Sequence, residues 1–446
     1  MGNVLFGLPF TKEDLSLIMD SFTAMTATSN ITSSFQGNRM KVFEGQPSLQ
    51  RLWSATRLLD CTNSIDHVYA ILGMADQSLF EHHLALTLEA SVSATEVFTA
   101  FTRVMLAESG SLTMLGFTTG KYFDPSEDTP ALPSWALRCD RHSWSALGKD
   151  TDMKPIALEI FDLIRHIGPR QKTFYAASGL WPPDLQIAND SIFNPFLKLK
   201  GLLVDTVVDV QVVEDFDELS WLVHHLHDWT AITSSMNSRY RNGETLAKVL
   251  FWTVLAGQVT ATHLFNADEA ADRYQLRLMK QDWINCICIS LQQAQSRGED
   301  ISVKLAELDR LALVDEEGYI ASSSDVTHFS WLSNGFEDEP ADVHGIEDDD
   351  DVTNDAMVFE VQYSVRRMCR KRLLYATAEG RLGLGPFGLC TGDQVWIVPG
   401  STVPFILRSI GDGRYVMVGE TYIRDIMFGE AVPECDDVEL TDIELV

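Results

Sequence analysis

Hydrophobic residues recur at three- and four-residue spacing in several parts of the chain, which is the pattern of amphipathic helices. Leu49, Leu52 and Trp53 share one face of the first strongly patterned segment. A short apolar periodicity near the N-terminus is weaker, and polar residues dominate the rest of the first 48 positions. The pattern predicts helices over residues 12–22, 49–60, 66–74, 94–108, 215–232 and 243–264.

Other segments are typical of strands. Residues 197–213 are dense in β-branched side chains and predict one or two strands. After residue 357 the chain alternates short apolar runs with glycines, which favours several short antiparallel strands. Gly411-Asp412-Gly413 predicts a hairpin turn, and a second turn is predicted at Gly383–Pro386, with no helix opening after Gly388.

These elements together predict an α+β protein with a mainly helical body and a C-terminal antiparallel β-barrel-like subdomain. A run of five carboxylates from Glu347 to Asp351 indicates a solvated loop, because like charges repel one another. The predicted organisation is an N-terminal extension at 1–48, a helical body at 49–333 with a strand segment near 172–213, an acidic loop at 334–356 and the β subdomain at 357–446.

Charge narrows the possible partners. The chain has a formal net charge of −30, which argues against nucleic acid and against an anionic membrane surface as ligands. Seven cysteines without regular spacing do not describe a disulfide framework, so a reduced compartment is expected. The N-terminus has no basic segment ahead of its short apolar stretch, and no apolar run reaches spanning length. A cytoplasmic location is therefore predicted.

Two sequence blocks agree in order and spacing with one known family. The first is the stretch CTNSIDHVYAILGM from Cys61 to Met74, in which Tyr69 is one of the shared residues. The second block runs from Cys369 to Ala431, and its shared residues include Gly383, Gly385, Pro386, Asp393, Arg408, Glu420 and Glu430. With these residues the chain resembles heterokaryon-incompatibility (HET) proteins of fungi.

The resemblance covers the region that follows the HET signature core. The core's own Tyr-x-Trp-Gly and Trp-Ile-Asp segments do not occur ahead of Cys61, and only 60 residues precede that position. The chain is therefore expected to lack the core that carries the family's death-inducing activity. Because the family's charged residues recur with glycines and strand residues, Asp393, Arg408, Glu420 and Glu430 are predicted to be structural.

Motifs for cofactors and metals are weak. Residues 383–388 satisfy the glycine pattern of a dinucleotide fingerprint, but a proline removes one N–H and a strand, not a helix, follows. His224 and Asp228, or His224 and His227, could share a helical face and hold a metal, yet no third ligand is apparent, and a solvated polar face is the better interpretation. No cofactor and no metal are predicted.

One aromatic stripe suggests a ligand pocket. Trp221, His225 and Trp229 are spaced four residues apart on one predicted helix, and Trp252 lies on the next. The alternative is that this helix packs against its neighbour in the hydrophobic core, with the histidine hydrogen-bonded and no ligand involved. The functional hypothesis is an apolar pocket for a hydrophobic small molecule, in a cofactor-independent cyclase or pericyclase of fungal specialised metabolism. The alternative hypothesis is an incompatibility or immunity factor that acts through protein–protein contacts.

Overall fold

The structure of the 446-residue chain is a computed structural model. It describes, besides isolated positions between them, residues 49–56, 64–74, 93–122, 132–139, 176–179, 194–211, 240–244, 246–260, 263–264, 372–433 and 438–446.

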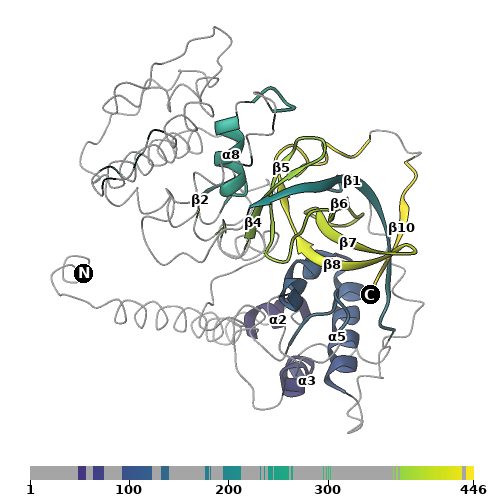
Figure 1. Ribbon diagram of the computed structural model, residues 1–446. Coiled ribbons are helices and arrows are strands. Elements are labelled where there is room, and N and C mark those ends of the chain that lie inside the picture. Colours follow the sequence, from purple (N-terminus) through teal and green to yellow (C-terminus); the bar gives the residue numbers. More distant parts are fainter. Residues whose placement is uncertain are drawn as a thin grey trace, which may run out of the picture.

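Three helices pack together on one side of the sheet (Figure 1). They are α2 (Leu49–Thr56), α3 (Ser64–Met74) and α5 (Ala94–Ser109). Helix α5 has a capping box, because the Ser93 hydroxyl accepts from the Glu96 N–H while the Glu96 carboxylate accepts from the Ser93 N–H. It ends at Gly110, whose φ of 59° lies in the left-handed region. The predicted helices at 66–74 and 94–108 are thus confirmed within two residues, and the described part of 49–60 is helical to Thr56.

A sheet of eight strands forms the other layer. The strand order is β10-β8-β7-β6-β1-β4-β5-β9. The strands are β1 (Leu197–Gln211), β4 (Arg372–Thr377), β5 (Leu382–Pro386), β6 (Gln394–Ile397), β7 (Phe405–Gly411), β8 (Arg414–Glu420), β9 (Tyr422–Ile423) and β10 (Thr441–Leu445).

The long strand β1 organises this sheet. Its first third pairs with β10, its middle with β6 and its end with β4, and the register shifts between Leu203 and Asp205 and between Val207 and Asp209. Such bulges bend a strand, which lets one segment serve three neighbours. The predicted strand region at 197–213 is therefore one strand, and its partner residues lie about 160 to 250 positions further along the chain.

Two parts of the predicted fold class need correction. The pairing of β10 with β1 joins β1, β6, β7, β8 and β10 in a ring, but β4, β5 and β9 continue from β1, and β10 runs parallel to β8. The result is a mixed eight-stranded sheet and not a simple antiparallel barrel. The mixed α+β class holds, whereas a mainly helical body is unsupported, since the described residues contain four α-helices.

The glycines at 383 and 385 lie within strand β5, so the predicted turn at Gly383–Pro386 is wrong. Residue 383 pairs with Tyr375 of β4, and a Cβ at this position would come within 2.6 Å of the Tyr375 ring. Glycine is needed here because the tyrosine ring crosses directly over the strand backbone. The turn lies earlier, where the Gly380 N–H donates to the Thr377 carbonyl. As predicted, no helix opens after Gly388.

Helix α8 (Leu246–Val254) is shorter than predicted. The pattern over 243–264 is interrupted because Ala256 and Gly257 adopt positive φ and the Gly257 N–H donates to the Trp252 carbonyl. The chain then forms the short strands β2 (Gln258–Thr260) and β3 (His263–Leu264), which pair with each other. The predicted hairpin is confirmed, since β7 and β8 are joined by Asp412 and Gly413, both at positive φ.

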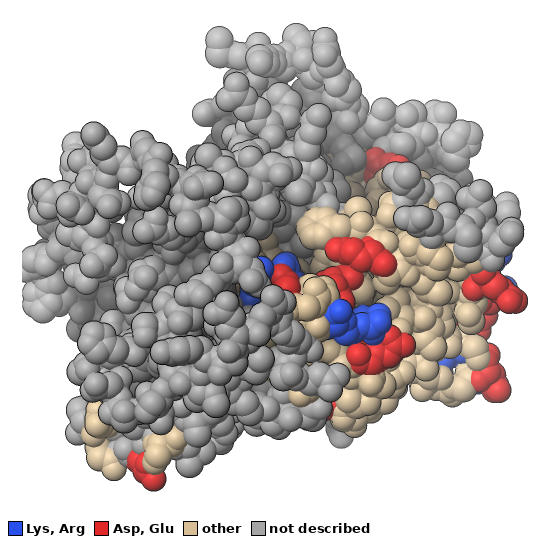
Figure 2. Space-filling model, turned by 90° about the horizontal axis from the view of Figure 1, so that it is seen from above, with Lys and Arg blue, Asp and Glu red and all other residues tan. Residues whose placement is uncertain are grey.

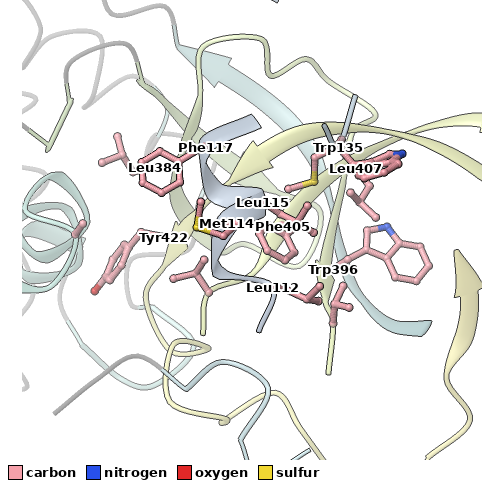
Figure 3. Packing of buried hydrophobic residues seen from close by; sticks show 14 of the residues in the cluster. Leu112, Met114, Leu115, Phe117, Trp135, Leu384, Trp396, Phe405, Leu407 and Tyr422 are labelled. Atoms are coloured by element: carbon pink, nitrogen blue, oxygen red, sulfur yellow. The ribbon is translucent and has the colours of Figure 1, made fainter. Parts of the chain in front are cut away.

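The largest hydrophobic core lies between the helices and the sheet. The 3-10 helix η3 (Thr113–Tyr122) packs against β8, and Figure 3 shows its apolar residues facing Phe405 and Leu407 of β7 and Trp396 of β6. Trp53 of α2 meets Phe117 of η3 edge to face, with ring centroids 4.6 Å apart. Helix α8 covers β5 from another side (Figure 1).

Candidate functional site

A polar cleft lies where the loop ahead of α8 meets the C-terminal strands. Its volume is about 530 Å³. In Figure 2 the Lys and Arg side chains visible on the described surface lie beside Asp and Glu side chains and form no patch of one sign. The described lining residues are Arg241, Asn242, Arg381, Tyr422, Arg424, Asp425, Ile426, Met427, Phe428, Glu430 and Ala431.

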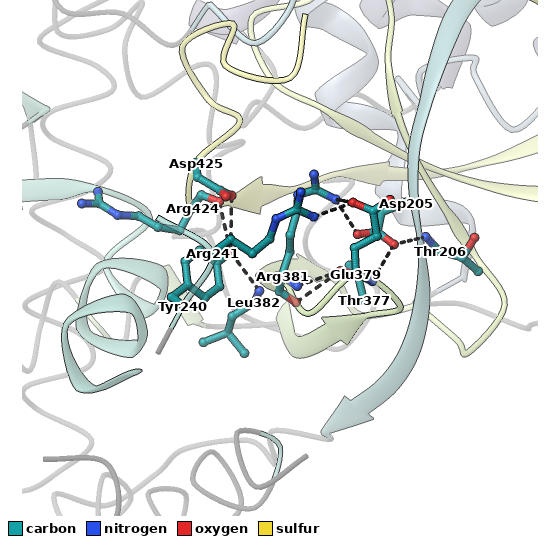
Figure 4. A network of polar contacts seen from close by, with 10 residues as sticks. All are labelled: Asp205, Thr206, Tyr240, Arg241, Thr377, Glu379, Arg381, Leu382, Arg424 and Asp425. Atoms are coloured by element: carbon teal, nitrogen blue, oxygen red, sulfur yellow. Dashed lines mark hydrogen bonds and ion pairs between the residues drawn. The ribbon is translucent and has the colours of Figure 1, made fainter. Parts of the chain in front are cut away.

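Tyr240 joins the loop to the sheet beneath the cleft (Figure 4). Its hydroxyl accepts a hydrogen bond from the Leu382 N–H at 3.2 Å and lies 3.2 Å from the Arg424 carbonyl, to which it donates. Asp425 Oδ1 is a second acceptor at 3.4 Å. Burial raises the pKa of the Tyr240 hydroxyl, and the nearby Asp425 carboxylate raises it further, so this phenol keeps its proton.

Arg381 is held from below by a buried carboxylate. Its Nη1 donates to Asp205 Oδ2 at 2.6 Å, and both side chains are largely buried. Asp205 Oδ1 is held in turn by the backbone N–H groups of Thr206 and Glu379. The Arg381 Nε is buried and has no hydrogen-bond partner among the residues that the structure describes. The Asp205 carboxylate thus fixes this guanidinium at the cleft while leaving donors unused.

Glu379 lies at the surface between two arginines. Its Oε2 accepts from Arg381 Nη1 at 3.0 Å and also from Arg241 Nη1. The Glu379 side chain is 54% exposed and that of Arg241 is 41% exposed. The hydrogen bond from Arg241 is the main cause that lowers the pKa of the Glu379 carboxyl, so the carboxylate is ionised at neutral pH.

A second ion pair, between Arg424 and Glu244, lies at the cleft, which Arg424 lines. Arg424 grips Glu244 with two hydrogen bonds, of 2.7 and 3.0 Å, and its guanidinium lies 5.5 Å from the centre of the Trp252 ring. Burial acts to raise the pKa of Glu244, but the hydrogen bonds and charge of Arg424 outweigh it and lower that pKa to about 2. Lys248 lies 3.4 Å from the same carboxylate.

Asp425 has an unusual backbone and an unusual carboxyl. Its φ of 75° is in the left-handed region. Burial raises its pKa to about 6, against the opposing charges of Arg381 and Arg241. The cleft therefore contains one carboxyl group that changes its protonation close to neutral pH.

Most described lining residues of the cleft, from Arg381 to Ala431, lie in a region that matches a known domain. Residues 343–440 match the family model described as the Het-6 beta-barrel domain. A segment of 95 residues is 35% identical to heterokaryon incompatibility protein 6, OR allele, of Neurospora crassa. The C-terminal region is related to HET proteins. The matched segment is 21% of this chain and 14% of that relative.

The match confirms the resemblance to HET proteins for the C-terminal block, residues 369–431. No solved structure matches the chain. In the part that the structure describes, no helix is both long and apolar enough to cross a membrane. Among the same described residues, no group of three potential metal ligands lies together.

The structure places only part of the predicted aromatic pocket. Trp221, His225 and Trp229 lie outside the described residues. Trp252 is in α8 and is buried in the main core, with Arg424 between its ring and the cleft, and it is not among the described lining residues. The pocket wall formed by the first three residues stays a prediction.

The family residues of the HET-related region form local contacts. Asp393 accepts two hydrogen bonds from Arg408, of 2.7 and 2.9 Å, and also one from the Cys390 N–H, which joins β6, β7 and the preceding turn. Glu420 pairs with Arg372 at 3.3 Å in full burial. The remaining family residues are Tyr69, half-buried in α3, Pro386, which ends β5, and Glu430, which accepts from the Phe428 N–H and lines the cleft.

Sequence reasoning missed the arginines of the cleft. Arg241, Arg381 and Arg424 come from three separate segments, and no local motif connects them. The sequence therefore held no signal that joins the three arginines, and only the tertiary structure brings them together.

Proposed function

We propose that this HET-related protein is a binding protein and that the arginine-lined cleft is its ligand site. The observation that carries the proposal is the convergence of three arginines from separate chain segments on one opening. Arg241 comes from the loop ahead of α8, Arg381 from the β4–β5 turn, and Arg424 follows β9, while the buried Asp205 of β1 holds Arg381 in place. Pre-ordered donors in a concave site are the usual means of orienting a ligand.

Binding accounts for the cleft better than covalent catalysis. Its described lining residues include no Cys, Ser, His or Lys, and the Asp425 carboxyl is engaged with the Tyr240 hydroxyl and with the charges of Arg381 and Arg241. The Tyr240 hydroxyl, which lies beneath, is engaged in hydrogen bonds and has a raised pKa, so it is a poor base. The charged groups hold one another in place, which suits recognition of a ligand by shape and charge.

Two finer versions of the proposal differ in the ligand. In the first, a hydrophobic small molecule binds between the described cleft and the predicted wall of Trp221, His225 and Trp229, and the protein acts as a cyclase or pericyclase by holding a reactive conformer. Phe428, which is 49% exposed at the cleft, supports an apolar contact. In the second, the ligand is a side chain of a protein partner, as expected for an incompatibility factor.

A variant that fills the cleft tests the proposal. Ala431→Trp puts a large ring on the half-buried cleft wall, and Ala70→Trp puts the same ring on the exposed surface of α3 as a control. Ligand-observed NMR would screen both variants and wild type against small acids, amides, terpenoids and polyenes. We expect some compounds to bind wild type and Ala70→Trp and to lose at least about tenfold in affinity for Ala431→Trp.

The screen also separates the finer versions. Binding of terpenoids or polyenes that is lost in His225→Ala and Trp229→Ala would favour the cyclase version. Binding only of compounds that resemble amino-acid side chains would favour the protein-contact version. If every bound compound binds Ala431→Trp and wild type equally, the cleft is not the ligand site.

A further inference from the structure

We propose that the cleft binds an oxyanion, a carboxylate or phosphate group, which takes the place of the Glu379 carboxylate on Arg241 and Arg381. This inference rests on the proposed function, since it names the chemical class of ligand for the same cleft. Glu379 is then an internal substitute that occupies the site when no ligand is bound.

The geometry around Glu379 is that of a bound anion. Two guanidinium groups from distant segments donate to one oxygen, Glu379 Oε2 (Figure 4). Planar guanidinium groups match carboxylate and phosphate oxygens because several N–H donors point the same way. A ligand oxygen at this position would receive the same hydrogen bonds.

Glu379 is the weakly held member of the group. It lies in the turn between β4 and β5, and its side chain is more than half exposed. Exposed ion pairs contribute little to stability, because water and salt screen them and both side chains lose freedom. Rotation of this carboxylate into solvent therefore costs little, whereas the turn backbone keeps its hydrogen bonds between Thr377, Gly380 and Arg381.

Arg381 remains in place without Glu379. Its bond to the buried Asp205 carboxylate is independent of the exposed one, and Asp205 is anchored by backbone N–H groups. Both acceptors use the same nitrogen, Nη1, whose two N–H groups can serve Asp205 and a second oxygen at once. When Glu379 leaves, the second N–H of Nη1 becomes available to a ligand oxygen.

The charges facing the site determine how an anion can bind. Once Glu379 turns away, Asp205 remains bonded to Arg381, and the Asp425 carboxylate still interacts with both Arg241 and Arg381, so the two arginines are balanced in charge but offer free N–H donors. Arg424 is paired with Glu244. The whole chain carries −30, so long-range attraction of an anion is absent and binding depends on direct contact. Phe428 offers its ring to the carbon part of the ligand.

The test compares Glu379→Gln, Arg241→Gln and wild type in the full chain. Calorimetric titrations at constant ionic strength would use inorganic phosphate, acetate and benzoate as probes. We expect Glu379→Gln to tighten binding by about threefold, because the internal carboxylate no longer competes. Arg241→Gln should weaken binding by about tenfold, since a charge-assisted hydrogen bond is lost. A preference for benzoate over acetate would indicate contact with Phe428, and preference for phosphate would indicate a phosphate ligand.

Arg414→Gln is the matched control. Arg414 is 44% exposed and pairs with Asp412 at the tip of the β7–β8 hairpin, away from the cleft, so its removal should leave all three titrations unchanged. Equal affinity of Glu379→Gln and wild type would overturn the displacement of Glu379. If neither protein binds any of the anions, while other compounds still bind wild type and lose affinity for Ala431→Trp, the inference fails and the proposed function stands.

Discussion

At the scale of single residues, two carboxyl groups near the cleft have pKa values that are shifted in opposite directions. Burial raises the pKa of Asp425 from 3.8 to about 6, whereas Arg424 lowers the pKa of Glu244 to about 2 despite burial. The two carboxyl groups lie in the same small region. Their difference arises because Glu244 accepts two hydrogen bonds from Arg424, whereas the described partner of Asp425 is the neutral Tyr240 hydroxyl.

The Asp425 carboxyl predicts a specific pH dependence of stability. Because its pKa is higher in the folded state, its contribution is complete below about pH 4 and is lost as pH rises through about 6. Replacement by Asn, which resembles the protonated form, should therefore become more favourable relative to wild type as pH rises from 4 to 7. Urea unfolding of wild type and Asp425→Asn at several pH values measures this difference.

Other titrating groups face the same site, so a control is needed. Arg381, Arg241, Tyr240 and Glu430 all act on the Asp425 carboxyl. Asp412→Asn, at the exposed hairpin tip, reports the general effect of removing one carboxylate from this acidic chain. A wild-type minus Asp425→Asn difference that is flat between pH 4 and 7 would show that the carboxyl is not perturbed by burial.

At the scale of elements, glycines determine how closely β4 and β5 pack. Tyr375 lies across Gly383 and donates or accepts a 2.7 Å hydrogen bond with the Thr421 hydroxyl, which also bonds to the Leu384 carbonyl. This arrangement connects β4, β5 and the segment ahead of β9. The family's paired glycines are therefore explained by the close approach of a ring and not by a turn.

Gly383→Ala tests that explanation. The added methyl group must displace the Tyr375 ring, so we expect the free energy of unfolding to fall by about 2 kcal/mol, as for an overpacked core. Gly385→Ala should lower the free energy of unfolding by less, because the added Cβ would lie 3.1 Å from its nearest neighbour, the Cε1 atom of Tyr375. Thermal and urea unfolding of both variants give the comparison. Equal stability of Gly383→Ala and wild type would mean that the ring does not occupy this position.

Elements with local signals were predictable, and those without them were not. Helix α5 has its own capping box and C-terminal glycine, and the β7–β8 hairpin has its Asp-Gly turn, so both lie where the sequence predicts them. Helix α8 continues as an apolar pattern beyond its true end, because periodicity does not register the backbone reversal at Ala256 and Gly257. The turn between β4 and β5 contains Gly380, but the sequence alone did not favour this glycine over those at 383 and 385, where the turn was predicted.

At the scale of the whole molecule, the sheet depends on contacts between distant segments. Strand β10 pairs with the start of β1 in antiparallel register and with β8 in parallel. Ser134 adds a further connection, because its hydroxyl accepts from the Met417 N–H while its own N–H donates to the Val446 carbonyl at 2.7 Å. The end of the described chain is thus fixed between β1, β8 and residues 132–135.

Ile443→Ala tests whether β10 is an integral part of the sheet. The side chain is 1% exposed in the main core, so its truncation should cost about 3 kcal/mol through lost burial and an unfilled cavity. Asp442→Asn changes the neighbouring residue, which faces solvent, and should leave stability within about 0.5 kcal/mol of wild type. Similar unfolding curves for the two variants would show that β10 is not packed as described.

The sequence by itself determined the features that depend on near neighbours: the capped helix α5, helix α3, the Asp-Gly hairpin and the strand character of residues 197–211. The order and spacing of residues in the block from Cys369 to Ala431 also carried the HET resemblance of the C-terminal region. Only the tertiary structure decided that β1 joins three strands about 160 to 250 residues away, and that Arg241, Arg381 and Arg424 meet at one cleft. Periodicity reports which face of a segment is buried, whereas ion pairs between distant segments depend on how the segments are placed in space.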